Sequence, residues 1–559
     1  MENVFINPLK EQWKSISDSF VYNINNEVIK IAASKYPPEI KQFDSTFTAQ
    51  KLMSRRDDLP KQAMKYYNFL ARGVTVTGSN EADYFHIQND NGGIKLSVYN
   101  KNKDGDTTSL NYQRTFTHKE TKELVIYGLN GNDKFVVDDN VSSRIKLRIV
   151  GGKGNDSFYL GGNIKKTLYD LSTEKNVIEK SRRTEKMFSK NPSVLEYKNT
   201  GFQYDKFIFP QINFGFNAED KILLGVGFSS KKYGFRKDPY ASLQKLTTLA
   251  AITLGAFQVK YEGIFNNIVL KNDLVINGEL QIPTLTNFFG YGNQSNYNKN
   301  LPLSYYRTRY KYGSFNVAVR KRFNDIFQIS IGPSYFRYWN DVADNKNRIL
   351  SVPSSVGRDS LGLYTSKEYL GGKVKLDINY INNEIFPTRG ITWFTTLSSL
   401  KGLNNYSNST TDIESDMTIY ASISDLSKVS GVLRFGGARI FSNNFEFFQA
   451  KSLGVQNYLR GYRRNRFSGK AMAYGSGELR CKIFKSKSFV LPGDVGILGF
   501  ADFGRVWQDN ENSKKWHNSF GGGFYFIPFN LITITATVAV SKEERLFNFS
   551  FGTKFNLIF

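Results

Sequence analysis

The stretch RLFNFSFGTKFNLIF, residues 545–559, decides how the rest of this chain is interpreted. Most of its apolar side chains occupy odd positions and alternate with polar ones, and Thr553 and Ile558 break the alternation; the apolar residues at odd positions are Phe547, Phe549, Phe551, Phe555, Leu557 and Phe559. A period of two predicts a β-strand with one apolar and one polar face. In a soluble sandwich the apolar face would pack on a second sheet, whereas in an outer-membrane barrel it would face lipid.

The composition of the 559-residue chain favours β-structure. Aromatic residues make up 15% of it, with 46 Phe and 32 Tyr, whereas Pro is scarce at 14 and the 46 Gly supply turns. Mean hydropathy is −0.41. No apolar run approaches the roughly 18 residues that a membrane-spanning helix needs, but barrel strands escape this criterion because they alternate apolar and polar residues.

Charge and cysteine content exclude several classes of protein. The net charge is +25, but Lys and Arg are scattered along the chain, with only short clusters such as Arg182-Arg183 and Arg463-Arg464. This distribution favours a solvated surface or a basic lumen, so we expect no nucleic acid among the partners. Cys481 is the only cysteine, which excludes an internal disulfide and a cysteine metal cluster.

Residues 1–73 are predicted to form a helical segment. Pro60 suits a first helical turn, with Asp58 as its cap. Apolar residues then recur at helical spacing until Gly73 stops the run; they are Ala63, Met64, Tyr67, Leu70 and Ala71. Core packing explains this stripe without a ligand.

Residues 74–204 are predicted to form a β-rich domain with a repeated turn. In three copies glycine leads to aspartate and then to phenylalanine; the copies are Gly78, Asp83, Phe85; Gly128, Asp133, Phe135; and Gly151, Asp156, Phe158. They resemble the glycine-aspartate repeat of calcium-binding β-rolls. The copies start 50 and 23 residues apart, so we do not expect the consecutive stacked turns that such calcium sites need. Two alternatives stay open, a repeated tight turn, and calcium bound at Asp133 and Asp156.

Residues 205–559 are predicted to form a 16-stranded antiparallel transmembrane β-barrel. The candidate strands are 209–217, 221–229, 247–261, 266–277, 303–311, 314–323, 326–338, 368–381, 390–399, 412–423, 428–440, 471–485, 489–507, 517–527, 531–541 and 545–559. Their even number, and short turns alternating with long polar connections, are typical of an outer-membrane barrel. The predicted fold class is therefore mostly β, with the barrel preceded by the helical segment and a β-rich periplasmic domain.

Four short motifs occur in order along this region. They are Phe386-Pro387-Thr388-Arg389-Gly390 between candidate strands eight and nine, Leu459-Arg460-Gly461-Tyr462 between strands eleven and twelve, Phe500, Asp502 and Gly504 in strand thirteen, and Gly552, Phe555, Leu557 and Phe559 in the last strand. Together they resemble signatures of the BamA/TamA family of outer-membrane assembly proteins, which includes the surface antigens. The resemblance implies that the second motif lies in the sixth extracellular loop and that the fourth is a C-terminal assembly signal.

Arg460 needs carboxylate partners if its loop folds into the lumen, because an unpaired buried charge is costly. Alternation in the twelfth strand predicts that Glu478 faces inward. Alternation around Asp502 is ambiguous, and the family resemblance implies that this residue also faces inward and pairs with Arg460. The alternative is that Arg460 is one more exposed loop arginine. Gly461 would let the loop turn sharply beside the charge.

The front of the chain departs from most of the family. No stretch before Asp205 has the βααββ pattern of the periplasmic POTRA repeats. The front resembles instead the segment that joins a calcineurin-like metallophosphoesterase to a BamA-like barrel in Bacteroidota proteins; the stretches that carry this resemblance are 55–59, 66–71, 127–129 and 151–154. It implies that a secretion signal and a phosphoesterase belong upstream of Met1.

The family resemblance implies an outer-membrane barrel that inserts, assembles or translocates other proteins through a lateral seam between its first and last strands. The implied partners are outer-membrane lipid, client outer-membrane or secreted proteins, and periplasmic or lipoprotein accessory subunits. A passive pore or surface barrel and a secretion transporter are the alternatives. We predict no enzyme activity, because His86, His118 and His517 are isolated and form no metal cluster. No cofactor is expected apart from the calcium alternative.

Overall fold

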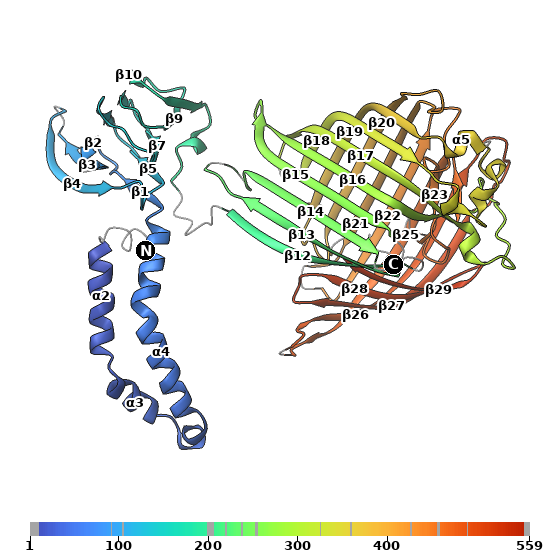
Figure 1. Ribbon diagram of the computed structural model, residues 1–559, viewed down its shortest axis with the longest axis horizontal. Coiled ribbons are helices and arrows are strands. Elements are labelled where there is room, and N and C mark those ends of the chain that lie inside the picture. Colours follow the sequence, from blue (N-terminus) through green and yellow to red (C-terminus); the bar gives the residue numbers. More distant parts are fainter. Residues whose placement is uncertain are drawn as a thin grey trace. The chain divides into compact units, whose positions relative to one another are not determined.

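The computed structural model describes residues 10–197 and 206–552, except residues 91, 103–104, 218–220, 236, 238, 252–254, 325, 358–359, 425–426, 456–458 and 489. The chain divides into two compact units, Met1–Gln203 and Tyr204–Phe559. Helices and two small sheets make up the first unit, and one large sheet dominates the second (Figure 1).

The first unit begins with α2 (Lys10–Asn23), α3 (Asn26–Ser34) and α4 (Pro38–Leu70). α4 is one helix of 33 residues with Pro60 in its interior, so the prediction that a helix starts at Pro60 is wrong. The start signals lie earlier, because Pro38 and Glu39 occupy the first turn. Tertiary packing overrides the helix-breaking proline: the ring of Trp13 in α2 lies 6.0 Å from the rings of both Tyr66 and Tyr67. None of the described helices is long and apolar enough to span a membrane.

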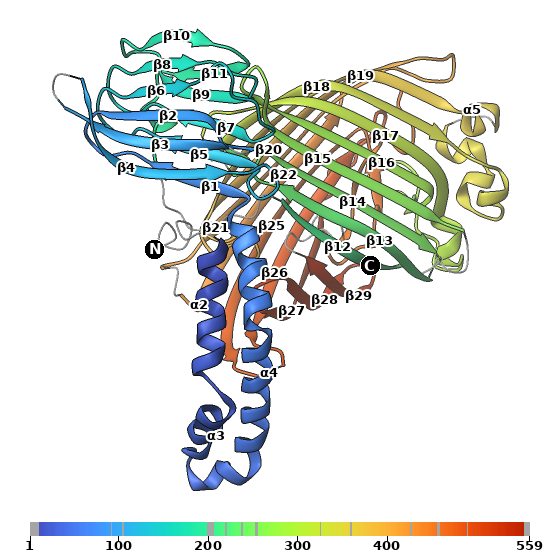
Figure 2. The same cartoon turned by 60° about the vertical axis from the view of Figure 1, so that its left-hand side comes forward.

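Eleven strands then wind into a two-sheeted β-solenoid, whose strands stack one above another (Figure 2). They are β1 (Gly73–Thr77), β2 (Asp83–Asp90), β3 (Gly93–Lys101), β4 (Thr107–Phe116), β5 (Glu123–Tyr127), β6 (Lys134–Val137), β7 (Lys146–Val150), β8 (Ser157–Leu160), β9 (Lys166–Leu171), β10 (Val177–Ser181) and β11 (Thr184–Ser189). One sheet has the parallel order β1-β5-β7-β9-β11. The other has the order β10-β8-β6-β2-β3-β4, in which only the β2–β3 and β3–β4 pairs are antiparallel. The apolar core lies between the two sheets.

The three glycine-aspartate copies lie in adjacent rungs of this solenoid, so the expectation that their turns are not consecutive is wrong. The β3–β4 hairpin is inserted between the first two copies and accounts for their larger separation. Asp133 Oδ1 accepts the backbone N–H of Asp83, and Asp156 Oδ1 accepts that of Asp133, both at 2.8 Å. The rings of Phe85, Phe135 and Phe158 stack at 4.5 and 5.2 Å between centroids. The repeat is therefore a stacked ladder.

The ladder carboxyls do not fit a calcium site. One oxygen of Asp133 and one of Asp156 accept backbone N–H groups, and the other oxygens lie buried against Gly128 and Gly151. Burial raises the pKa of Asp133 to about 8 and that of Asp156 to about 6. Among the residues that the structure describes, no group of three or more His, Cys, Asp or Glu is arranged to hold a metal.

The second unit is one antiparallel sheet of sixteen strands that curves into a barrel (Figure 1). In sheet order the strands are β12 (Lys206–Asn217), β13 (Lys221–Lys232), β14 (Ser242–Ala251), β15 (Phe257–Val269), β16 (Asn272–Asn287), β17 (Arg307–Arg322), β18 (Phe327–Trp339), β19 (Lys367–Ile381), β20 (Gly390–Gly402), β21 (Thr410–Ala421), β22 (Val429–Ile440), β25 (Ala471–Ser486), β26 (Gly493–Trp507), β27 (His517–Pro528), β28 (Thr533–Ser541) and β29 (Arg545–Gly552). The predicted fold class, mostly β with sixteen antiparallel barrel strands, is confirmed.

The predicted strand count is right partly because two errors cancel. The segments predicted at 247–261 and 266–277 cover parts of three strands, because the connections that separate β14, β15 and β16 are short. Leu270 and Lys271 form the β15–β16 turn with positive φ although neither is a glycine, so the two turn positions themselves do not indicate a turn. The segments predicted at 303–311 and 314–323 belong to the single strand β17, whose interior Gly313 imitates a break.

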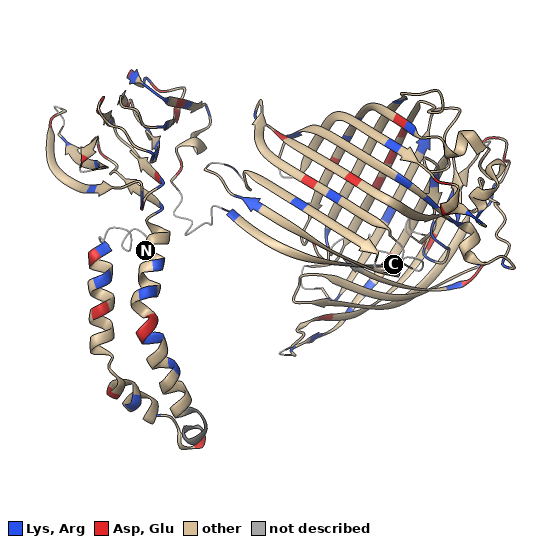
Figure 3. Ribbon diagram, in the orientation of Figure 1, with Lys and Arg blue, Asp and Glu red and all other residues tan. Residues whose placement is uncertain are grey.

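The three longest connections lie at the same end of the barrel (Figure 1). The long connections 288–306, 340–366 and 441–470 gather at what we call the loop end, where they share an aromatic core that includes Phe288, Tyr338 and Phe447. The last of them contains the small hairpin of β23 (Lys451–Leu453) and β24 (Phe467–Gly469), and we call it the inserted loop. The opposite end, with connections such as 382–389, is the turn end. Lys and Arg are spread over both units (Figure 3).

Candidate functional site

The inserted loop lies against the inner wall of the barrel at β25 and β26. Its residues Leu459, Tyr462 and Phe467 are buried and pack with Tyr474 of β25 and Val506 of β26. Side chains alternate along these strands, so that Glu478 and Asp502 face the loop while neighbours such as Leu479 are exposed on the other face. The apolar contacts hold the loop in place, and Glu478 and Asp502 present negative charge to it.

Arg460 sits between two carboxylates. Its Nη1 donates to Glu478 Oε2 at 2.5 Å and its Nη2 to Asp502 Oδ1 at 2.7 Å, while Nε reaches Asp502 Oδ2 at 3.0 Å. The guanidinium also donates to Ser476 Oγ at 2.9 Å and lies 3.5 Å from the ring centroid of Phe500. Asp502 Oδ2 accepts the backbone N–H of Arg460 as well, at 3.0 Å. The side chain is thus paired on every polar edge, as a buried cation requires.

Two glycines, Gly461 in the loop and Gly504 in the wall, allow the inserted loop to lie close to the barrel wall. Gly461 has no left-handed backbone; an added Cβ would come within 2.6 Å of Ser519 Cβ and 3.0 Å of Val540 O. Glycine is therefore needed here for close approach to β27 and β28, not for the sharp turn that the sequence suggested. Gly504 lies under the loop in the same way, because a Cβ there would meet Leu453 at 3.0 Å.

The turn at 386–390 lies at the turn end of the barrel and is joined through Arg480 to Glu478, one of the two carboxylates that pair with Arg460. Asn382 Oδ1 accepts the backbone N–H groups of Thr388 and Arg389 at 3.1 Å, and Gly390 has φ of +120°. The carbonyl of Pro387 accepts a hydrogen bond from Arg480 Nη1 at 3.2 Å. The guanidinium of Arg480 also lies 4.6 Å from the ring centroid of Phe386.

Sequence reasoning missed the role of Arg480. Its Nε donates to Glu478 Oε1 at 2.7 Å, so Glu478 lies between Arg480 and Arg460 and joins the turn to the inserted loop. The available signal was the spacing of two residues in an alternating strand, which puts Arg480 on the same face as Glu478.

Two further arginines of the inserted loop were also missed as site residues. Arg463 pairs with Glu544, and Arg466 pairs with Glu543, in the short connection between β28 and β29. The sequence showed a basic loop and two adjacent glutamates, but nothing in their spacing predicts that they meet, because 77 to 81 residues separate the partners.

The last strand is described up to Gly552, which pairs with Thr533 of β28. Phe547 is exposed on one face, whereas Asn548 Nδ2 donates to the carbonyl of Arg460 at 3.1 Å on the other. The remaining residues of the C-terminal motif, Phe555, Leu557 and Phe559, lie outside the described residues.

The strands β12 and β29 stand at the two ends of the sheet order. Within their described parts no backbone pairing joins one to the other. Among the described residues β12 pairs with β13 and β29 pairs with β28, so each strand stands at one end of the sheet.

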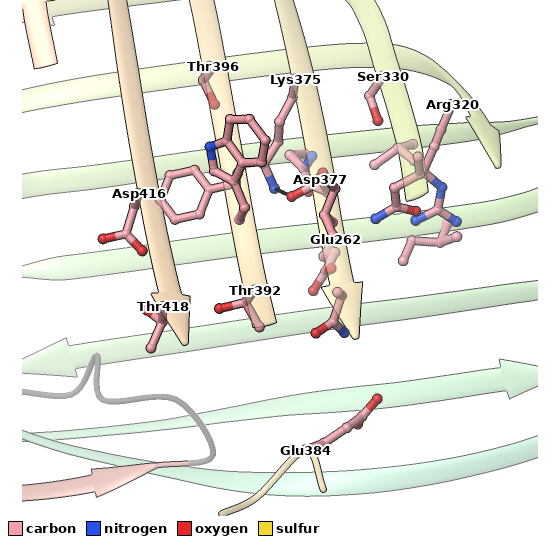
Figure 4. Close-up of a pocket in the computed structure, with 18 of the residues that line it drawn as sticks. Glu262, Arg320, Ser330, Lys375, Asp377, Glu384, Thr392, Thr396, Asp416 and Thr418 are labelled. Atoms are coloured by element: carbon pink, nitrogen blue, oxygen red, sulfur yellow. Dashed lines mark ion pairs between the residues drawn. The ribbon is translucent and has the colours of Figure 1, made fainter. Parts of the chain in front are cut away.

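A polar cavity of about 620 Å³ lies inside the barrel towards the turn end. Both acidic and basic side chains line it, among them Glu262, Arg320, Lys375 and Asp377 (Figure 4). Lys375 pairs with Asp377 at 2.7 Å. This balance of charges suits a hydrated lumen and does not select one small ligand.

Comparison with known proteins fits this geometry. The Omp85 superfamily domain matches residues 271–555, which is slightly more than half of the chain. No curated protein sequence matches this chain.

Several solved structures are similar to it. BamA from Haemophilus ducreyi lacking POTRA domains 1–3 is 15% identical, with a TM-score of 0.44 over 63% of this chain and 70% of that one. CdiB from Escherichia coli is 10% identical, with a TM-score of 0.39 over 61% of this chain and 60% of that one.

The family match to residues 271–555 confirms the resemblance that the motifs indicated. The chain belongs to the Omp85 superfamily and is an outer-membrane β-barrel protein of a Gram-negative bacterium, with a role in inserting or translocating other proteins.

Proposed function

We propose that this barrel inserts or assembles other β-barrel proteins through a lateral seam between β12 and β29. One observation carries the proposal: both strands end the sheet, and their described parts do not pair with each other. Free N–H and C=O groups along such edges are a template for an incoming strand, which adds to the sheet by β-augmentation. The client is then an outer-membrane or secreted protein, helped by periplasmic or lipoprotein accessory subunits.

The mechanism needs no bond cleavage. A client strand that pairs on the edge exchanges hydrogen bonds to water for hydrogen bonds to the barrel, which is important because a strand cannot enter lipid with unpaired backbone groups. Burial of the client's apolar face in lipid supplies the driving force. The inner wall stays polar around the cavity near Lys375 and Asp377, so the client has a hydrated route on one side and lipid on the other.

A secretion transporter is the second candidate function. The polar cavity favours it, because a lumen lined by mixed charges accommodates an unfolded hydrated chain. A passive pore is less consistent with the structure, since the inserted loop and the aromatic core of the loop end fill space that an open pore would leave free.

The test is a reversible lock across the seam. Cysteine at Asn213 of β12 is combined in turn with cysteine at Asn548 or Ser550 of β29, in a Cys481→Ser background. If the seam works, the oxidised lock reduces incorporation of a co-expressed outer-membrane barrel at least about tenfold, and a reductant restores it. The matched control places cysteines at Thr537 and Asn548, which already face each other in the β28–β29 ladder.

Unchanged incorporation in the locked barrel contradicts the insertion proposal. Loss of a secreted cargo from the medium, with membrane barrels at normal levels, instead identifies the secretion transporter.

A further inference from the structure

We infer that Arg463 and Arg466 are positioning residues that fasten the β28–β29 hairpin to the inserted loop and keep it fastened while the barrel works. We call the two ion pairs, Arg463–Glu544 and Arg466–Glu543, the arginine latch. The inference deepens the proposed function, since the hairpin carries one edge of the proposed seam.

The latch consists of two bidentate pairs in one short connection. Arg463 donates from Nε to Glu544 Oε1 at 2.9 Å and from Nη2 to Oε2 at 2.6 Å. Arg466 donates from Nε to Glu543 Oε2 at 2.8 Å and from Nη2 to Oε1 at 2.9 Å. Paired N–H donors on a carboxylate are the strongest and most geometrically specific arrangement of these groups, so the connection is held in both position and orientation.

The environment of Arg466 makes its pair hard to separate. Its side chain is only 4% exposed, and that of Glu543 is 22% exposed. Nη1 donates to Ser295 Oγ and Nη2 to the carbonyl of Ser295, both at 2.8 Å, and the guanidinium lies 4.6 Å from the ring centroid of Phe467. These contacts keep the arginine in place, so movement of Glu543 would leave a buried cation without its anion.

The same loop contacts the hairpin at two further positions, one in β28 and one in β29. Gly461 lies against the backbone of β28, where an added Cβ would meet Val540 O at 3.0 Å. Asn548 of β29 donates to the carbonyl of Arg460 at 3.1 Å. Arg460 is itself fixed to β25 and β26 through Glu478 and Asp502. The inserted loop therefore connects the hairpin to wall strands that lie two and three strands from β28, independently of the backbone ladder.

The first strands of the sheet are held differently. The side-chain hydrogen bonds described for this region run between nearby strands, as from Asn213 of β12 to the carbonyl of Thr248 and from Tyr261 to Gln244. Among the described residues of β12–β14, none is hydrogen-bonded or ion-paired to the inserted loop. Of the two edges, as far as the structure describes them, it is the hairpin edge that has a second attachment to the inserted loop, and this observation gives the latch a positioning role.

The test measures attachment in the purified full-length barrel, without any client. Glu543→Gln with Glu544→Gln removes both negative charges while keeping side-chain shape. We expect hydrogen exchange in the peptides of residues 533–552 to become about tenfold faster, and tryptic cleavage after Arg463, Arg464 and Arg466 to increase similarly. Lys542→Gln, an exposed change in the same connection, is the matched control and leaves both rates unchanged.

A charge swap distinguishes the loss of one specific ion pair from a general loss of folding. Arg463→Glu and Glu544→Arg each accelerate exchange when introduced alone, and the double variant restores the slow rate. Exchange that stays slow in the Gln variants, or a swap that restores nothing although the barrel is folded, overturns the latch.

A crosslink tests whether the latch stays closed during work. Arg463→Cys and Glu544→Cys, joined by a short bismaleimide in the Cys481→Ser background, should leave client incorporation at the level of the uncrosslinked variant. Loss of incorporation on crosslinking overturns the inference, because the latch must then open. If the parent barrel incorporates no client at all, the proposed function fails, while the exchange measurements still decide whether the latch exists.

Discussion

The solenoid and the barrel both bury carboxyl groups, but they accommodate them in opposite ways. In the solenoid, burial raises the pKa of Asp133 and Asp170 to about 8, and backbone N–H groups supply their hydrogen bonds. In the barrel, Glu478 and Asp502 are paired with the guanidinium of Arg460. In the solenoid, the backbone N–H of one repeat donates to the carboxyl of the next repeat. In the barrel, the buried carboxylates are paired with an arginine from a distant loop. The solenoid should therefore respond to pH, and the barrel to the loss of one side chain.

The largest effect that tests this difference is expected from Arg460→Ala. The substitution leaves Asp502 buried without a cation and Glu478 with Arg480 as its remaining cation, which should lower the free energy of unfolding of the barrel by about 3–5 kcal/mol. Urea titration of the detergent-solubilised protein, followed by the heat-dependent gel mobility of the barrel, measures the change. Arg439→Ala alters an exposed arginine of β22 and should stay within about 0.5 kcal/mol of the parent. A similar value for Arg460→Ala would mean that the barrel carboxylates do not depend on it.

Gly151→Ala should weaken the solenoid by about 1–3 kcal/mol, because it forces a methyl group into a filled space. The added Cβ would lie 2.5 Å from Asp156 Oδ2, so the ladder must shift. Hydrogen exchange of the peptides that cover β7 and β8 reports the loss. Gly73→Ala provides the comparison, since nothing lies within 4 Å of its Cβ position. Equal exchange in the two variants would argue against tight packing of the ladder.

The solenoid should lose stability as pH rises from about 4 towards about 8. The pKa of Asp133 and Asp170 is raised from 3.8 to about 8 by burial, so the folded state holds protons that the unfolded chain has released. Each carboxyl then contributes at most about 1.4 kcal/mol per pH unit over this range. Exchange rates in β6 and β9 measured between pH 5 and pH 8, corrected for intrinsic exchange, test the sign. Asp133→Asn should flatten the dependence, and a rise in stability with pH would contradict the neutral ladder.

The smallest effect is expected from calcium. Because the ladder oxygens face backbone N–H groups and glycines, a chelator or added calcium should leave solenoid exchange unchanged. Slower exchange on addition of calcium, absent in Asp156→Asn, would revive the calcium alternative.

The barrel could be predicted from sequence where each strand carries its own pattern. Alternation along 429–440, 471–486 and 517–528 is local, so these strands were located within a few residues. The turn at Leu270 and Lys271 was missed because neither of these two positions holds a glycine, proline or asparagine, although Asn272 follows directly. Pairing of Arg460 with Glu478 and Asp502 was expected largely through the family resemblance, which local pattern cannot replace.

The stacking of the solenoid repeats and the ion pairs of the latch could not be predicted from local sequence pattern, for a common reason. The insertion of β3 and β4 hid the adjacency of Asp83 and Asp133, which are 50 residues apart but hydrogen-bonded. Arg463 and Glu544 are 81 residues apart and have no periodic relation. Contacts of this kind depend on how strands are ordered in three dimensions, and a single sequence gives the residue types without that order.

The position of Glu478 between Arg460 and Arg480 has a consequence for how the barrel is built. The bond from Arg480 to Pro387 spans 93 residues, and that from Arg460 to Asp502 spans 42. These contacts cannot form until the β19–β20 turn, the β25–β26 wall and the inserted loop have all folded into place, because each contact joins elements that are distant along the chain. Before that moment the charged groups must remain hydrated. Expulsion of this water is thus a late event in folding, and its completion marks a barrel whose interior is fully assembled.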